Sequence, residues 1–536
     1  MATLSTTESA IDAATLATGD EADRVAHSRP GAHSYGQILK SSVVIGGASF
    51  LEIGIGIVRT KANALLLGPA GFGLMGLYLS ILNLAQSVAG MGVNSSGVRQ
   101  IAAAAGSGDA QRIARTTLVL RRASVVLGLL GAGLLVALAR PVSALTFGTD
   151  SFAVPVALLS LAVLFRVVSD GQRALIQGLR RLPELATITV LGGVIGTAAS
   201  VALVYAFRER GVVPTLIAIN AATLVVSWRL SRQVKVESLE LTASQVGGEL
   251  RDLLQLGFAF LASGMLTMGA AYAVRIVIVR QAGLAAAGLY QSAWTLAGLY
   301  VGFVLRAMGA DFYPRLTAAV RNRPECNRLV NEQAEVSLLL AGPGIIGTLA
   351  LAPLVVTLFY SSAFQPAVEV LRWTVLGATL QVITWPIGYI IVAEGRQGLF
   401  FLTELSYTLV YLGLAWALVG RLGINGAGVA FFGSYLFHWL LVYPIVRRLT
   451  GFRWSSANLR LGAASLAAVS VVFAVHYLLP FWPATAVGSV AAALSALYSA
   501  CILVRLVSAD RLPSPVRRLL ATLHLASTGA ARGGTT

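Results

Sequence analysis

Charged side chains are scarce in this sequence, and acidic ones are scarcer than basic ones. Only 12% of the 536 residues are charged, about half of the roughly 25% that soluble domains carry. The 23 acidic residues stand against 40 Lys and Arg, which leaves a net charge of +17. This scarcity excludes an ordinary soluble protein. Long apolar runs recur from residue 38 to residue 504 with a mean hydropathy of +0.76, and they indicate a polytopic α-helical membrane protein.

Cysteine, histidine and lysine are also rare, and each rarity excludes a kind of site. Two cysteines, Cys326 and Cys501, are too few for a disulfide framework. The five histidines lack ligand spacing, so we expect neither a metal nor a cofactor. No lysine follows a Gly-x-x-x-x-Gly loop, so a P-loop ATPase is excluded. The basic residues form no Lys/Arg-rich tract, which argues against a nucleic-acid partner.

Apolar segments of membrane-spanning length predict about fourteen helices. We expect them at 38–67, 72–95, 117–139, 153–176, 185–207, 213–230, 254–280, 286–308, 334–359, 367–393, 399–419, 425–446, 461–479 and 484–504. Basic residues concentrate in alternate loops, and the positive-inside rule then places both termini in the cytoplasm. The outer loops are short, and their only basic residues are Arg140, Arg208, Arg210 and Arg421.

A short internal echo predicts two related lobes of six helices each. The sequence GLYLS begins at Gly76 and GLYQS begins at Gly288, each at the start of a helix after a glycine-containing turn. Repeats in one orientation are a common transporter plan, with the substrate site between the halves. The expected parts are a disordered cytosolic tail (1–37), an N-lobe (38–231), a cytosolic linker (232–253), a C-lobe (254–446), an extra helix pair (447–504) and a basic cytosolic tail (505–536).

Seven cationic residues lie inside the predicted helices. They are Arg59, Lys61, Arg166, Arg173, Arg275, Arg280 and Arg372. A cation in the hydrocarbon core costs about 2.5–3.5 kcal/mol on insertion scales, so such residues normally face a water-filled cavity or a partner charge. Several of them in one bundle predict a polar cavity suited to an anionic passenger.

The depth of each cation in its helix and the charged residues near it indicate different roles for these cations. Arg59 lies too deep to reach the outer interface easily, and it shares a helix face with Glu52. The two residues therefore either make an orienting salt bridge or leave Arg59 to line the cavity. By the echo, Arg275 falls beside the position of Asn63, so both lobes offer cations at similar depth. Arg280 lies near an outer turn and is expected to snorkel.

A second group of polar residues lies on the helix at 153–176. Arg166, Asp170 and Arg173 share one stripe, where Asp170 can neutralise only one arginine. Asp170 is either an ion-pair partner or a protonatable coupling site. Elsewhere we expect Arg372 to pair with Glu369, and Glu404 and His438 to be lone structural groups. The candidate substrate-binding cations are thus Arg59, Lys61, Arg275, Arg166 and Arg173, with Glu52 and Asp170 as candidates for ion coupling or charge pairing.

Two stretches resemble the N-terminal signature of Wzx-type O-antigen flippases of the MOP superfamily. The first is VRTKANALLLGPAGFGLMGL from Val58, and the second is GVNSSGVRQIA from Gly92. The resemblance implies an all-α, MATE/MurJ-like fold with two six-helix lobes around a central cavity, and it places Arg59 at a cavity position. Such flippases usually have twelve helices, so the pair at 461–479 and 484–504 departs from the pattern.

The resemblance also implies a function. We expect a flippase and not an enzyme. The flippase would move an undecaprenyl-pyrophosphate-linked oligosaccharide, an O-antigen or exopolysaccharide unit, across the bacterial inner membrane by alternating access. Expected partners are membrane lipid and polysaccharide-assembly proteins such as a polymerase and a chain-length regulator.

Three alternatives are weaker. A MATE-like exporter of cationic drugs would need acidic intramembrane residues, and here cations outnumber the acids. A membrane glycan polymerase or ligase usually needs a sizeable outer loop, and none is present. A scaffold that transports nothing has little reason to keep uncompensated arginines in the membrane.

Overall fold

The computed structural model describes residues 32–234 and 242–506, and in these ranges the protein is almost entirely helical, without a strand. Eleven of the described helical stretches are long and apolar enough to cross a membrane. Three of them hold two segments each, joined at Gly68, at 208–211 and at Gly283. The described helices therefore match the roughly fourteen predicted segments, and the predicted all-α membrane fold is confirmed.

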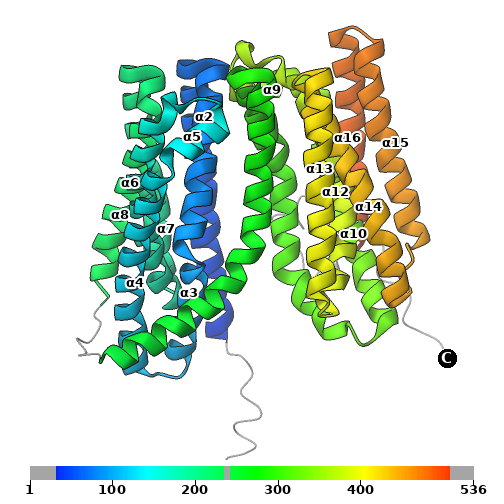
Figure 1. The fold of residues 1–536 in the computed structure, drawn as a ribbon. Coiled ribbons are helices and arrows are strands. Elements are labelled where there is room, and N and C mark those ends of the chain that lie inside the picture. Colours follow the sequence, from blue (N-terminus) through cyan, green and yellow to red (C-terminus); the bar gives the residue numbers. More distant parts are fainter. Residues whose placement is uncertain (1–31, 235–241, 507–536) are drawn as a thin grey trace, which may run out of the picture.

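The N-lobe forms one bundle, coloured blue to teal in Figure 1. Its α-helices are α2 (Ala32–Gly90), α3 (Val93–Gly106), α4 (Ala110–Ala137), α5 (Ala139–Phe147), α6 (Ala153–Gly178), α7 (Leu182–Phe207) and α8 (Val212–Arg232). Two 3₁₀ turns, η1 (Asp150–Phe152) and η2 (Arg208–Gly211), complete it. Its core is apolar and includes the fully buried Leu82, Leu159 and Val163.

The C-lobe forms the second bundle, coloured green to orange in Figure 1. It contains α9 (Ala243–Ala319), α10 (Arg323–Ala350), α11 (Ala352–Phe359), η3 (Ser362–Phe364), α12 (Ala367–Ala393), α13 (Gln397–Leu422) and α14 (Asn425–Thr450). The extra pair is α15 (Ser456–Leu478) and α16 (Phe481–Leu506). In Figure 1, α2 begins and α16 ends at the lower end of the bundle, which we call the terminal end, and the opposite end is the far end.

Some predicted loops are helical. The helix α3 occupies part of the predicted inner loop after residue 95, and α5 occupies much of the outer loop predicted between residues 139 and 153. Pro141 lies in the first turn of α5, where its missing N–H group breaks no helical bond. The helix α9 begins inside the predicted linker because Thr242 and Gln245 form a capping box. The predicted tails fall largely outside the described residues, although α2 already begins at Ala32.

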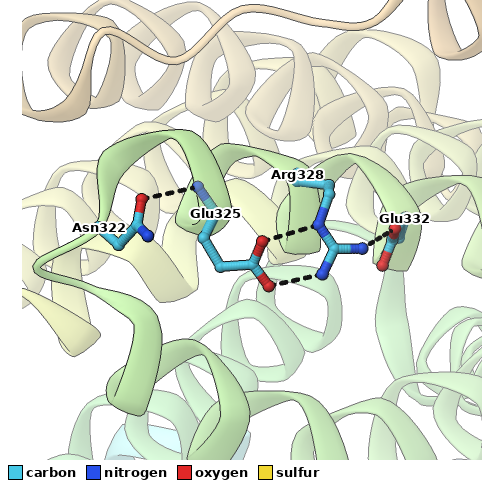
Figure 2. Close-up of polar contacts among 4 residues, drawn as sticks. All are labelled: Asn322, Glu325, Arg328 and Glu332. Atoms are coloured by element: carbon cyan, nitrogen blue, oxygen red, sulfur yellow. Dashed lines mark hydrogen bonds and ion pairs between the residues drawn. The ribbon is translucent and has the colours of Figure 1, made fainter.

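Capping and ion pairs also fix the start of α10 (Figure 2). The Oδ1 of Asn322 accepts a hydrogen bond from the backbone N–H of Glu325 at 3.3 Å. Arg328 donates from Nε to Oε2 of Glu325 at 2.8 Å, and it also pairs with Glu332. Each exposed pair contributes only about 0–1 kcal/mol, so the network marks the helix start more than it stabilises the fold.

The lobes meet at the far end through two reciprocal backbone contacts. A Cβ atom at Gly73 would lie 2.2 Å from the carbonyl oxygen of Leu284, and one at Gly288 would lie 1.9 Å from that of Pro69. Only glycine allows helices to approach this closely. Because the two contacts have the same form with the lobes exchanged, a local twofold axis relates α2 to α9 here.

The kinks obey the same symmetry. Gly68 has φ 63° and ψ −174° inside α2, and Gly283 has φ 85° and ψ 175° inside α9. The lobes are therefore related as the echo predicts, but its register was wrong by three residues, because the backbone symmetry pairs Gly73, not Gly76, with Gly288. In the corrected register Arg275 corresponds to Thr60, the neighbour of Arg59.

The extra helix pair packs against α10 of the C-lobe. A Cβ atom at Gly488 would lie 2.5 Å from the Cβ of Ala350. Asn458 donates from Nδ2 to the carbonyl oxygen of Asn331 at 2.8 Å. The predicted start of this part, residue 447, comes early, because α14 continues to Thr450 before α15 begins.

Candidate functional site

Arg59 lies in α2 with no hydrogen bond or ion pair from any described residue. Its side chain is half-buried, nine residues before the kink at Gly68. Glu52 is the charged group that acts on it electrostatically, but the two do not come within 4 Å. The salt bridge considered for this pair is therefore not formed. Arg59 keeps all its guanidinium donors available at a depth of about 13 Å below the kink.

Arg166, Asp170 and Arg173 lie along α6, as their spacing predicts, but they do not pair with one another. Arg166 donates from Nη1 to Oδ1 of Asn83 at 3.1 Å, and Asp170 accepts from Nε2 of Gln86 at 2.8 Å. Both amides belong to α2. Arg166 and Asp170 therefore each bond to a neutral amide of α2, although the charges on α6 still act on one another through space.

Arg173 completes this stripe with no direct partner among the described residues. It is half-buried, and its interactions with Arg166 and Asp170 are electrostatic only. The stripe carries two cations and one anion, so an excess positive charge remains inside the N-lobe. Sequence reasoning found the stripe but missed Asn83 and Gln86, because amides on another helix give no spacing signal.

Arg275 lies buried where the two lobes meet, and all three of its guanidinium nitrogens donate a hydrogen bond to protein. Its Nε and Nη2 donate to Oε1 of Gln291 at 3.0 and 2.8 Å, and its Nη1 donates to the carbonyl oxygen of Ala271 at 2.8 Å. Its Cζ lies 5.9 Å from the ring centroid of Tyr290. Gln291 in turn packs against Gly76 of the N-lobe. In this conformation Arg275 supports the lobe interface through those bonds.

Lys61 and Arg280 both join the lobes at the far end. Lys61 donates from Nζ to the carbonyl oxygen of Thr357 in α11 at 2.7 Å. Arg280 is exposed and donates to the carbonyl oxygens of Ala144 and Leu145 at 2.9 and 3.2 Å. These carbonyls lie in the last turn of α5, where the helix dipole favours a cation.

Aromatic side chains add to the same far-end contact. The ring of Phe72 in α2 lies 5.4 Å from that of Tyr360 and 5.7 Å from that of Phe364, both edge-to-face. The hydroxyl of Tyr272 in α9 forms a hydrogen bond with Thr146. Together with Lys61 and Arg280, these residues close the far end. At the terminal end α9 itself passes from the N-lobe to the C-lobe (Figure 1).

The remaining charged residues of the C-lobe divide into one predicted pair and one unexpected pair. Arg372 donates from Nη1 to Oε1 of Glu369 at 2.7 Å, so the predicted ion pair is confirmed. Tyr477 of α15 also bonds to Glu369. Glu404 and His438 lie close together, with Oε1 and Nε2 3.7 Å apart, although no hydrogen bond joins these two atoms. Sequence reasoning expected each to stand alone and missed this proximity, because it depends on how α13 and α14 pack.

A cavity of about 550 Å³ lies beside this second pair, between α9, α12, α13 and α14. Aromatic side chains form about a third of its lining, and they include Trp294, Trp385, Tyr389, Tyr407, Tyr411 and Tyr435. The signal was present in the sequence: Glu404, Tyr407 and Tyr411 repeat at helical spacing on α13. Such stripes are usually core, which is why the sequence alone did not indicate a cavity.

Comparison with known proteins identifies the family to which the chain belongs. A family model described as a polysaccharide biosynthesis protein matches residues 64–369, more than half of the chain. The chain belongs to this polysaccharide biosynthesis family. The matched region runs from α2 into the first turn of α12 and includes Arg166, Arg173 and Arg275.

Curated relatives and solved structures agree with the family. The lipid III flippase of Escherichia coli K12 is 22% identical over 416 residues, which is 75% of this chain and 97% of that protein. The lipid II flippase MurJ, in an inward closed conformation, gives a TM-score of 0.65 at 14% identity, covering 87% of this chain and 99% of that one.

A third likeness is to an inward-facing multidrug resistance MATE transporter of the MOP superfamily. It has a TM-score of 0.60 at 17% identity, covering 76% of this chain and 96% of that one. The predicted MATE/MurJ-like fold and the resemblance to MOP-superfamily flippases are confirmed. The named relatives are flippases and transporters rather than enzymes.

Proposed function

We propose that this protein flips a polyprenyl-pyrophosphate-linked oligosaccharide, an O-antigen or exopolysaccharide unit, across the bacterial cytoplasmic membrane. The observation that carries the proposal is the set of membrane-embedded arginines without a direct protein partner, Arg59 and Arg173. Membership of a polysaccharide biosynthesis family and relatives named as lipid flippases support it. The terminal end then faces the cytoplasm, with both termini inside.

The chemistry of arginine suits this cargo. A guanidinium binds phosphate oxygens with two parallel hydrogen bonds and stays charged in a poor dielectric. A pyrophosphate brings the negative charge that the excess cations of the N-lobe lack, and it offsets the cost of about 2.5–3.5 kcal/mol that each buried cation carries on insertion scales. Asp170 and Glu52 moderate that positive charge without cancelling it.

Alternating access follows from the way the lobes touch. The far-end contact consists of hydrogen bonds, aromatic edges and glycine crossings between the two bundles. Opening it while closing the terminal end would carry a headgroup from one leaflet to the other, and the lipid tail would remain in the bilayer. The energy source is the membrane potential or an ion gradient.

The test is reconstitution into vesicles that carry a headgroup-labelled, undecaprenyl-pyrophosphate-linked repeat unit in the inner leaflet. We expect the label to become accessible to a membrane-impermeant reagent, with protein-free vesicles as the control. The cationic dye ethidium serves as a second cargo. Transport of ethidium with no movement of the labelled lipid would replace the proposal with a MATE-like exporter.

A genetic test runs in parallel. The chain should restore surface glycan in a bacterial strain that lacks its own flippase for the same repeat unit, and Arg59→Ala should not. Arg210→Ala is the matched control, because Arg210 is exposed on η2 and makes no hydrogen bond or ion pair with another described residue. Full restoration by Arg59→Ala at equal expression would contradict the assigned role of Arg59.

A further inference from the structure

We propose that the aromatic cavity of the C-lobe binds a sugar ring of the glycan headgroup, with Glu404 and His438 as its polar anchor. The inference rests on the proposed function, since the sugar belongs to the same cargo. The cavity has a volume of about 550 Å³, which falls within the range of small-ligand sites, about 300–1,000 Å³. Such sites combine apolar walls with a few convergent polar groups, as this cavity does.

The walls present aromatic rings from several helices. The ring centroids of the lining residues Tyr407 and Tyr435 lie 4.9 Å apart. The hydroxyl of the lining residue Tyr411 is joined by a hydrogen bond of 2.9 Å to that of the buried Tyr290, which does not itself line the cavity. The faces of aromatic rings carry partial negative charge. They therefore attract the weakly positive C–H faces of a pyranose ring, which leaves the hydroxyl groups at the ring edge to find polar partners.

The polar partners are two side chains that do not satisfy each other. His438 is only 6% exposed, and neither ring nitrogen has a hydrogen-bond partner in the described protein. The nearest carboxylate oxygen, on Glu404, lies 3.7 Å from Nε2, beyond hydrogen-bond distance. A buried polar group without a partner is costly. A hydroxyl group between the two would donate to Glu404 and bond to the imidazole, and both would then be satisfied.

Further oxygen acceptors face the same space. Thr374 and Thr384 line the cavity, and each donates its own hydroxyl proton to a helix carbonyl four residues earlier. Their oxygens therefore remain as acceptors for a ligand O–H group. Gln381 also lines the cavity. Acceptors around an aromatic wall match a neutral polyol.

A cationic ligand matches the cavity less well. Glu404 is the sole carboxylate among the described lining residues, and it stands beside an imidazole. Arg275 lies behind one wall, because its Nη1 bonds to the carbonyl oxygen of the lining residue Ala271. Its positive charge opposes a second cation in the cavity.

The test is ligand binding by the purified full-length protein, measured by saturation-transfer NMR and tryptophan fluorescence. The probes are free N-acetylglucosamine, glucose, galactose and mannose, with tetraphenylphosphonium as the cationic competitor. We expect at least one sugar to bind, with a change in fluorescence from Trp294 and Trp385. Glu404→Gln should weaken binding about tenfold, the value of one charged hydrogen bond.

Two further variants keep the test decisive. Gln381→Ala removes a lining group without touching the anchor pair, and it should weaken binding even if Glu404→Gln fails to fold. Glu184→Gln changes a half-buried carboxylate paired with Arg181 in the N-lobe, far along the chain from the cavity residues, and it should bind as the unchanged protein does. Equal loss in Glu184→Gln would overturn the assignment to this cavity.

The failures of the two proposals differ. If no sugar binds and vesicles still flip the labelled lipid, the cavity assignment is overturned and the flippase stands. If sugar binds and no lipid moves, the proposed function fails instead. Tight binding of tetraphenylphosphonium in place of every sugar would also overturn the sugar assignment.

Discussion

Replacing Arg280 with alanine should weaken the closure of the far end by a measurable amount. The change removes two hydrogen bonds from a charged donor to the carbonyl oxygens of Ala144 and Leu145. A buried charged bond contributes about 1.5–3 kcal/mol, but Arg280 is exposed, so solvent screening reduces the two together to about 1–2 kcal/mol. That free energy changes the ratio of open to closed far ends by a factor of about 5–30.

The assay is a distance distribution between spin labels at Asp150 and Ala363. Both positions are exposed at the far end, one in each lobe, on η1 and η3. Cys326 and Cys501 are first replaced by alanine so that only the two sites are labelled. We expect Arg280→Ala to increase the ratio of the long-distance to the short-distance population about 5–30 times. An unchanged distribution, or the same change in the exposed Arg210→Ala control, would refute the role of Arg280.

Other substitutions test the packing. Gly288→Ala should stop flipping and favour an open far end, since its Cβ would lie 1.9 Å from the carbonyl oxygen of Pro69. Gly269→Ala is the control and should flip normally, because its Cβ would have no atom within 4 Å. A normal flipping rate in Gly288→Ala would contradict the glycine crossing. Asn458→Ala should destabilise the protein by about 1–3 kcal/mol, because it removes the bond between α15 and Asn331, and an unaltered melting temperature in detergent would contradict that contact.

The sequence predicted the architecture well, because membrane helices are defined by length and hydropathy. The segment bounds and the pair Glu369–Arg372 follow from local patterns along one helix, and the two lobes follow from the echo between two helices. The short helices α3 and α5 were missed because neither is long enough to span a membrane, and the apolar pattern therefore places both in loops. The register of the echo was wrong because a five-residue match carries less information than the backbone symmetry of Gly68 and Gly283.

The site was less predictable, because its contacts join separate helices. Intramembrane charge singled out Arg59 and Arg275 together, and their similar depth agrees with the twofold relation of the lobes. Only the packing of the helices distinguishes the roles of these two arginines: Arg275 is bonded to Gln291, and Arg59 is not bonded to any described residue. The approach of Glu404 to His438 likewise depends on how α13 and α14 pack, which no spacing within either helix reveals.

The most direct test of the central claim is the flipping rate of the reconstituted protein with Arg59 changed. The claim is that a membrane-embedded arginine without a protein partner binds the pyrophosphate of the lipid-linked glycan. Arg59→Ala should lower the rate at least about tenfold, the effect of losing one charged hydrogen bond, Arg59→Lys should recover part of it, and Arg210→Ala should leave it unchanged. Equal rates for Arg59→Ala and Arg210→Ala, at equal protein per vesicle, would contradict the account.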